Sequence, residues 1–163
     1  MKETGSGGTA EVREYKTLFT ESDYSGEDIF YADEERKVPF NGVVEDYDGG
    51  QLRWKFDVRD GFRTGKEWVY YETGELMEEN ETDHNTICGF AAEFYRNGVL
   101  KSAGTAIRNV FIESVFFDVS GEEISRETEK GKSPSCPFTA EEIEEYRKKY
   151  RLDDFIESIR KRS

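Results

Sequence analysis

The chain has 163 residues and a formal net charge of −13, with 36% charged and 35% hydrophobic residues. This length is that of a single domain, and the low apolar content argues against one large core. Aromatic residues make up 14% of the chain, which excludes a wholly disordered protein because disordered segments are poor in aromatics. We therefore expect a thin fold, a sheet with much of its surface in water.

The acidic excess lies in the first four-fifths of the chain. Residues 1–128 carry 14 Lys and Arg against 28 Asp and Glu, whereas residues 129–163 carry 9 against 8. Such a field repels phosphate backbones and anionic lipid heads, so we expect neither nucleic acid nor a membrane as partner. It favours a basic protein partner, whose encounter it would speed. Acidity that only maintains solubility is the alternative.

The sequence contains no signal for export or membrane insertion. Its N-terminus lacks the apolar region of a secretory signal, and no stretch approaches the roughly 20 apolar residues that span a bilayer. Cys88 and Cys136 are the only cysteines and cannot build a disulfide framework, which favours a reducing compartment. We expect a cytoplasmic protein in which residues 1–20 form a partly disordered N-terminal arm.

Residues 21–128 contain five copies of one pattern, an aromatic residue followed by a glycine, a polar residue and usually an aliphatic one. The glycines of these copies lie 24, 24, 24 and 23 residues apart, at Gly26, Gly50, Gly74, Gly98 and Gly121. A second glycine series with spacings of 23 and 24 comprises Gly42, Gly65 and Gly89. A single unit of this size cannot bury its apolar face alone, so neighbouring units are expected to stack.

Each unit is predicted to be a β-hairpin. Asn97-Gly98 is typical of a type I′ turn, because Asn and Gly tolerate positive φ. Period-2 alternation places apolar residues on one face of the predicted sheet: Leu52, Trp54, Phe56 and Val58, continued by Trp68 and Tyr70. The other face would carry a recurring row of tyrosines, Tyr47, Tyr71 and Tyr95. The predicted fold is mainly β, an elongated antiparallel meander of about ten strands with a period of about 24 residues.

The end of the chain has a different pattern. Residues 129–138 form a predicted linker, and residues 139–163 a helical cap. Thr139 and Glu142 have the spacing of a capping box, and apolar residues follow at helical spacing with a change of phase near residues 151–153. We therefore expect two short α-helices that cover the end or one face of the sheet, because open sheets need covered edges.

Catalytic and metal-binding patterns are lacking. His84 is the only histidine and has polar neighbours, so we predict a solvated loop residue and no metal or cofactor. Neither cysteine has a base nearby in sequence that would activate its thiol. The sequence from Gly61 to Lys66 lacks the spacing of a phosphate loop, and the one that begins at Asp46 lacks the glycine and glutamate of a calcium loop. We expect a protein that is not an enzyme.

Two repeats carry a family resemblance. The phrases Gly65-Lys-Glu-Trp-Val-Tyr-Tyr-Glu-Thr-Gly-Glu-Leu76 and Gly89-Phe-Ala-Ala-Glu-Phe-Tyr-Arg-Asn-Gly-Val-Leu100 resemble the MORN-variant repeat of the bacterial YwqK-type antitoxin (immunity) family. The resemblance covers about residues 24–128. It implies a β-hairpin ribbon that neutralises a cognate toxin by direct binding, often a toxin with a nuclease domain. The degenerate outer units and the C-terminal helices depart from the pattern.

Two functions therefore compete. The first is an immunity protein that blocks a basic toxin domain, and the second is a MORN-type scaffold or adaptor for protein–protein or membrane-proximal interactions. The acidic repeats favour the first. We expect the toxin to meet one face of a monomer or weak homo-oligomer, edged by an acidic cluster and anchored by the tyrosine row. These residues are Glu72, Glu75, Glu78, Glu79, Glu81 and Asp83, with Tyr47, Tyr71 and Tyr95.

Overall fold

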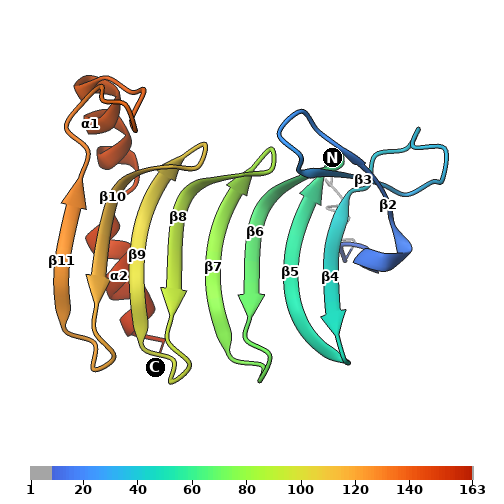
Figure 1. Ribbon diagram of the computed structural model, residues 1–163, viewed down its shortest axis with the longest axis horizontal. Helices are drawn as coiled ribbons and strands as arrows, with labels where there is room; N and C mark the ends of the chain where they lie inside the picture. Colours follow the sequence, from blue (N-terminus) through green and yellow to red (C-terminus); the bar gives the residue numbers. More distant parts are fainter. Residues whose placement is uncertain (1–8, 163) are drawn as a thin grey trace, which may run out of the picture.

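The computed structural model describes residues 9–162 and is dominated by one twisted sheet (Figure 1). Nine strands of these residues form it in the order β1-β4-β5-β6-β7-β8-β9-β10-β11. From β4 onward each strand pairs antiparallel with the next, so the predicted meander is confirmed. The meander strands are β4 Gly42–Asp48, β5 Gln51–Arg59, β6 Phe62–Tyr70, β7 Leu76–Asp83, β8 Thr86–Phe94, β9 Leu100–Ile107, β10 Val110–Phe117 and β11 Glu123–Thr128.

The first predicted repeat does not belong to the meander. Strands β2 (Phe19–Ser22) and β3 (Asp28–Tyr31) form a separate two-stranded hairpin, the N-terminal hairpin. Before it, a short 3-10 helix follows β1 (Val12–Glu14), which pairs parallel with β4 at the edge of the sheet. The arm predicted for residues 1–20 thus contains a sheet strand, and residues 1–8 lie outside the described part of the chain.

From β5 onward the hairpin turns alternate between two kinds at the two ends of the strands. At one end, five-residue loops place glycines at positive φ: Gly74 at 99°, Gly98 at 85° and Gly121 at 95°. At the other end, two-residue turns have both residues at positive φ, as type I′ requires: Asp60-Gly61, His84-Asn85 and Arg108-Asn109. The type I′ prediction for Asn97-Gly98 was therefore wrong, because only Gly98 of that pair has positive φ.

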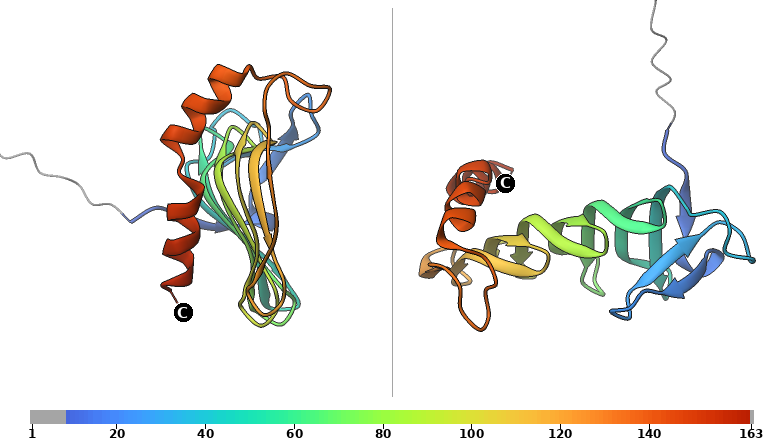
Figure 2. Two further views of the ribbon diagram at one scale, coloured as in Figure 1. Left: turned by 90° about the vertical axis from the view of Figure 1, so that its left-hand side faces the viewer. Right: turned by 90° about the horizontal axis from the view of Figure 1, so that it is seen from above.

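Strand alternation gives the sheet two faces, each covered by a different part of the chain (Figure 2). The hairpin face packs against the N-terminal hairpin, and one of its cross-strand rows runs through Val44, Phe56, Glu67, Asn80 and Ala91. The helix face packs against the C-terminal helices, and one of its rows runs through Lys55, Trp68, Glu79, Ala92 and Ala103. Because Phe56 pairs with Glu67 rather than with Trp68, the prediction that Trp68 and Tyr70 continue the Trp54 face was wrong.

The two predicted helices are confirmed, α1 from Ala140 to Lys149 and α2 from Leu152 to Arg160. Thr139 and Glu142 form the predicted capping box. Helix α2 buries Leu152, Ile156 and Ile159 against β8, β9 and β10, and each such side chain contributes about 1.5–3 kcal/mol on burial. Helix α1 adds Ile143, which packs on Ile112 and Cys136.

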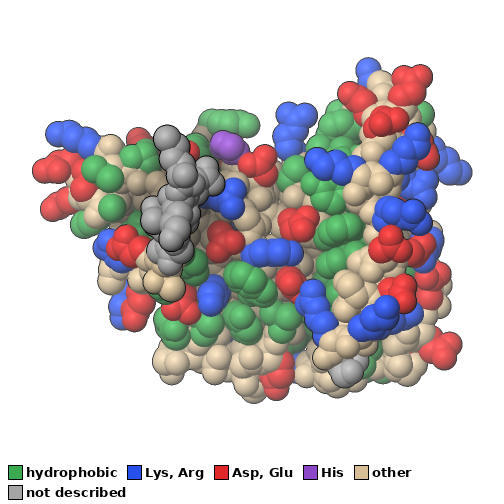
Figure 3. Space-filling model, turned by 180° about the vertical axis from the view of Figure 1, so that it is seen from behind, with side chains coloured by type: hydrophobic (Ala, Val, Ile, Leu, Met, Phe, Trp, Pro, Cys, Tyr) green, Lys and Arg blue, Asp and Glu red, His purple; other side chains and the backbone are tan. Residues whose placement is uncertain are grey.

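The hairpin and the helices lie on opposite faces and at opposite ends of the sheet (Figures 1 and 2). The N-terminal hairpin packs over Val44, Phe56 and Val58, whereas the helices pack over β8 to β10. Beside the helices, the helix face shows hydrophobic side chains mixed with charges of both signs (Figure 3). Half of each face is therefore left without cover from the described residues.

Candidate partner-binding surface

The predicted acidic cluster does not edge one face. Glu72 and Glu75 lie in the loop between β6 and β7, whereas the other members lie on or beside β7. Glu78 pairs with Glu93 on the hairpin face, and the neighbouring residue Glu79 points to the helix face. The prediction of a single acidic edge was therefore wrong, because successive residues of a strand alternate between faces.

Two members of the cluster are bound within the fold. Glu79 is buried and forms an ion pair with Arg162 at 2.5 Å. Glu81 accepts a hydrogen bond from the backbone N–H of Phe90 at 3.0 Å, and its side chain lies so close to Gly89 that a Cβ there would clash. Glu79 thus ties β7 to the C-terminal segment and Glu81 ties β7 to β8, so neither carboxylate stands free for a partner.

A matching contact one repeat earlier explains two of the three glycines of the second series, Gly65 and Gly89, whereas Gly42 faces the backbone of Glu11 instead. Asp57 accepts a hydrogen bond from the backbone N–H of Lys66 at 2.9 Å, and a Cβ on Gly65 would lie 2.6 Å from the Asp57 carboxylate. Gly65 and Gly89 also have φ of 126° and 120°. The repeated glycine therefore makes room for a carboxylate folded over the next strand.

The loop members of the cluster are exposed and partly paired. Glu72 forms an ion pair with Arg96 at 2.6 Å, and Glu75 accepts a hydrogen bond from Thr73. The pKa of Glu72 is lowered, first by a hydrogen bond from its own backbone N–H and then by Arg96. Asp83 lies at the opposite end of β7, next to the exposed His84 that its carboxylate contacts at 2.7 Å. His84 is the predicted solvated loop histidine.

The tyrosine row is two residues long. The hydroxyl of Tyr71 donates to the carbonyl of Phe94 at 2.7 Å, and that of Tyr95 to the carbonyl of Phe117 at 2.8 Å. Each tyrosine therefore ties one repeat to the next. Tyr47 does not belong to this row. Its position matches that of Tyr70, because Tyr47 pairs with Leu52 and Tyr70 pairs with Leu76 across their turns. Residues 48–51 separate the first pair and residues 71–75 the second, so the first connection is one residue shorter.

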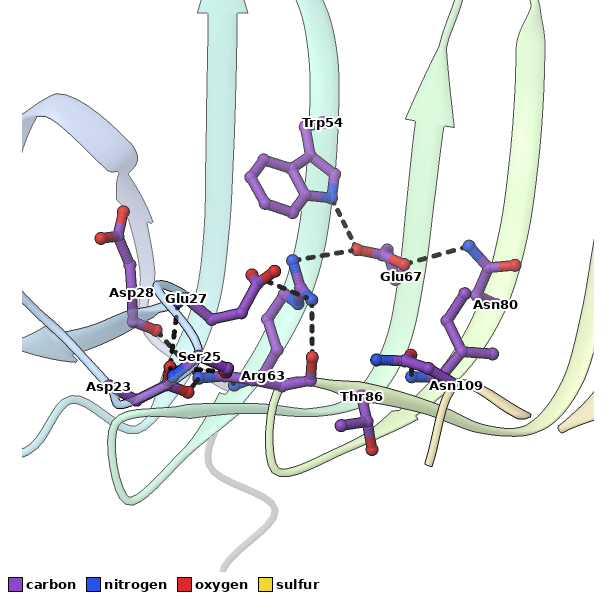
Figure 4. A network of polar contacts seen from close by, with 12 residues as sticks. Asp23, Ser25, Glu27, Asp28, Trp54, Arg63, Glu67, Asn80, Thr86 and Asn109 are labelled. Atoms are coloured by element: carbon purple, nitrogen blue, oxygen red, sulfur yellow. Dashed lines mark hydrogen bonds and ion pairs between the residues drawn. The ribbon is translucent and has the colours of Figure 1, made fainter. Parts of the chain in front are cut away.

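A polar network that the sequence analysis missed lies on the hairpin face, beside the N-terminal hairpin (Figure 4). Its centre is Glu67, which is only 6% exposed. The Glu67 carboxylate accepts hydrogen bonds from Trp54 Nε1 at 2.9 Å and Asn80 Nδ2 at 3.0 Å, and pairs with Arg63 at 3.6 Å. The buried charge is thus paired and hydrogen-bonded, as burial requires.

Arg63 connects this network to the N-terminal hairpin. Its guanidinium lies 5.1 Å from the centre of the Trp54 ring, donates to the carbonyl of Asn85 at 2.9 Å and lies 3.6 Å from Glu27 (Figure 4). The Asn85 amide in turn donates to Asp23 at 3.2 Å. Asp23 has its pKa lowered to about 2, above all by the Ser25 hydroxyl. The network therefore marks the border where the cover of the hairpin face ends.

Beyond that border the hairpin face forms a groove of about 340 Å³ over β7 to β10. Glu78 and Glu93 lie directly opposite each other in its wall, and Phe111 and Phe116 are 42% and 37% exposed at its rim. Other lining residues include Ile87, Ala91, Ser102 and Ser114. A second hollow of about 410 Å³ adjoins it around Trp54 and Glu67 and shares Glu78, Asn80 and Ile87.

The two groove carboxylates differ in their partners. Glu93 pairs with Lys101 at 2.6 Å. Glu78 accepts a hydrogen bond from Asn80 at 3.3 Å and forms no ion pair with any residue between 9 and 162. Burial raises the pKa of Glu78, and the nearby carboxylates of Glu67 and Glu93 raise it further, against the opposing effects of the Asn80 hydrogen bond and the charge of Lys101. Lys101 thus faces both Glu78 and Glu93, and this wall of the groove carries an excess of negative charge.

A larger hollow lies elsewhere, and the charges that line it are already paired. It measures about 710 Å³ and lies between the end of α2 and the five-residue loops, over Leu76, Phe94 and Leu100. Its arginines include Arg96, paired with Glu72, and Arg162, paired with Glu79. An anionic ligand would have to break these ion pairs, so this hollow is the weaker candidate.

The sequence held a signal for the groove that alternation alone did not expose. The row that starts with Val44 and Phe56 continues with Glu67 and Asn80, so polar residues occupy positions that are apolar one hairpin earlier.

No group of three metal-ligating side chains occurs among the described residues. None of their helices has both the length and the apolar content to cross a bilayer.

Comparisons with known proteins add no relative. The chain matches no family model, no curated protein and no solved structure. The resemblance to the MORN-variant repeat therefore rests on the repeat residues themselves.

Proposed function

We propose that this chain is an immunity protein that neutralises a basic toxin domain of the nuclease type by binding it directly in the cytoplasm. The observation that carries the proposal is the open half of the hairpin face, where Glu78 and Glu93 face exposed Phe111 and Phe116 across a groove. Exposed aromatics beside two carboxylates, of which Glu78 has no ion pair within the described chain, suit a protein surface that is both basic and partly apolar.

The positive charge of a nuclease domain would complement the acidic surface of this chain. A domain that binds phosphate backbones does so with clustered Lys and Arg. An acidic surface that covers such a cluster competes directly with the nucleic acid, and the acidic excess of residues 1–128 speeds the encounter. The aromatic rim then supplies contact area from which water is excluded, where binding energy is concentrated.

The test is co-expression with a candidate basic toxin domain, sought first in the neighbouring genes, followed by growth assays and by titration of the purified proteins. We expect the chain to restore growth, to bind the toxin at nanomolar concentrations and to prevent its binding to nucleic acid. A double variant, F111S/F116S, should lose protection, whereas I124S on exposed β11 should keep it, because Ile124 lies outside the groove.

Other outcomes would overturn the proposal. Absence of binding to the toxin, or protection that survives F111S/F116S, would remove the groove from the mechanism. Strong binding to anionic vesicles together with no binding to the toxin would favour the scaffold or adaptor instead.

A further inference from the structure

Glu78 is the groove residue around which negative charges gather, so a cationic ligand would be favoured there. It lies in a row with Glu93 across the β7–β8 pair, and like charges directly opposite each other destabilise a sheet. Glu67 on β6 adds a third carboxylate nearby. Lys101, whose charge also acts on Glu78, pairs with Glu93, and Arg63 is engaged with Glu67, Glu27 and Asn85.

The walls beside these carboxylates are apolar. Ile87, Ala91 and Phe116 line the same groove, and the exposed rings of Phe111 and Phe116 border it. A side chain that fills this groove therefore needs a positive end, an apolar stem and a flat surface that stacks on an aromatic ring. Arginine has all three, and its planar fork can contact two carboxylates at once.

We propose that the groove between Glu78 and Phe116 is the docking site for an arginine side chain of a basic protein partner, whose guanidinium bridges Glu78 and Glu93 while Glu93 keeps its ion pair with Lys101. This inference rests on the proposed function and names the contact through which a basic toxin domain is recognised. The stem of the arginine lies along Ile87 and Ala91, and its flat face stacks on Phe116. The chain uses the same combination internally, where Arg63 lies over Trp54 and pairs with Glu67.

The test uses three fluorescent hexapeptides, hexa-arginine, hexa-lysine and hexa-citrulline, titrated with the full chain by anisotropy. Citrulline has the shape of arginine without its charge, so the third peptide measures apolar contact alone. We expect hexa-arginine to bind at least fivefold more tightly than hexa-lysine, and hexa-citrulline not to bind.

Two variants with the same change in net charge separate the groove from the general acidity of the chain. Glu78→Gln should weaken hexa-arginine binding about tenfold, because it removes the unpaired carboxylate and keeps the shape of the groove. Glu72→Gln, in the exposed loop between β6 and β7, should leave the affinity within twofold. Phe116→Ala should reduce the preference for arginine over lysine. Thermal unfolding of each variant checks that the sheet is intact.

Equal weakening by Glu78→Gln and Glu72→Gln would overturn the inference, since attraction would then be general. Equal affinity for the arginine and lysine peptides would also overturn it. If these peptide results are negative while the chain still protects cells from the toxin, the arginine site fails and the proposed function stands. If the peptide results are positive while no basic toxin is bound, the proposed function fails instead.

Discussion

The hairpin face is covered by its own chain at β4 and β5 and left open over β7 to β10. In the covered half, Val44 and Phe56 are fully buried, and the ring centre of Phe30 from the N-terminal hairpin lies 5.4 Å from that of Phe56. In the open half, the equivalent rows hold Asn80, Glu78 and Glu93. Both halves consist of antiparallel strands of the same meander. The side chains in the rows therefore decide which half of the face the chain itself can cover.

The border between the halves shows why the cover stops there. Glu67 continues the row of Phe56, and a charge can be buried only when it is paired and hydrogen-bonded. Arg63, Trp54 and Asn80 meet that requirement at the edge of the N-terminal hairpin. One strand farther on, Glu78 has no such set of partners, so a cover from the same chain would bury an unbalanced charge.

The largest test of this comparison is loss of an aromatic ring from each half. Phe56→Ala should destabilise the fold by about 3–5 kcal/mol, because the ring is 0% exposed and its removal leaves a cavity under the N-terminal hairpin. Phe116→Ala should cost less than about 1 kcal/mol, because that ring stays partly in water. Urea unfolding of both variants measures the difference, and similar losses would contradict the division into a packed and a free half.

Local sequence signals were enough for most of the architecture. The 24-residue glycine register, the alternation in β5 and the capping box of Thr139 and Glu142 each describe contacts between residues close in sequence. They predicted the meander and the two helices. Turn residues alone could not tell where the first hairpin goes. Its loop accepts hydrogen bonds at Asp23 as the last loop does at Asp118, yet only the last hairpin stays in the sheet.

The groove was beyond these signals for a different reason. Glu67 and Asn80 are single polar residues in strands that contain many, and their burial depends on neighbours one and two strands away. Likewise, the offset of Tyr47 from Tyr71 and Tyr95 follows from one residue missing in a loop, which the spacing to the next glycine concealed. Composition predicted a basic partner, but only the pairing of charges indicates which carboxylate is left for it.

The second test removes the carboxylate of Glu67, the centre of the polar network at the border between the two halves. Glu67→Ala should destabilise the fold by about 3 kcal/mol, because it leaves Trp54 Nε1 without its acceptor, removes one of the two acceptors of the Asn80 amide and removes a buried partner of Arg63. Glu72→Ala, which breaks the exposed pair with Arg96, should be nearly silent. Chemical unfolding measures both changes, and hydrogen exchange in β2 and β3 should report loosening of the N-terminal hairpin in the first variant alone.

The third test concerns the tyrosines that join repeats. Tyr95→Phe should cost about 0.5–1.5 kcal/mol, since the carbonyl of Phe117 loses the hydroxyl that bonds it. Tyr47→Phe should cause no measurable change in stability, because Tyr47 is exposed and does not belong to the row of Tyr71 and Tyr95. Thermal unfolding of the two variants under the same conditions is the measurement. Equal losses of stability in the two variants would mean that Tyr47 belongs to the row of Tyr71 and Tyr95 after all.

The smallest effect should be a gain in stability at Glu78 that depends on pH. In the folded state burial raises the pKa of this carboxyl above its ordinary value of 4.5. The unfolded chain then loses its proton first as the pH rises, so folding is favoured by this group at low pH and that contribution is lost above the folded pKa. Glu78→Gln should therefore stabilise the protein at pH 7 by about 0.2–1 kcal/mol, the size of a cross-strand pair.

Below pH 4 the same variant should match the parent, because both then carry a neutral side chain at this position. Glu67→Gln is the matched comparison from the closed side of the border: it should destabilise at pH 7, where the Glu67 charge is paired with Arg63. Urea unfolding between pH 3.5 and 7.5 measures both curves. A loss of stability for Glu78→Gln at pH 7 would mean that the fold already balances this carboxylate, and the open half would then need no cationic partner.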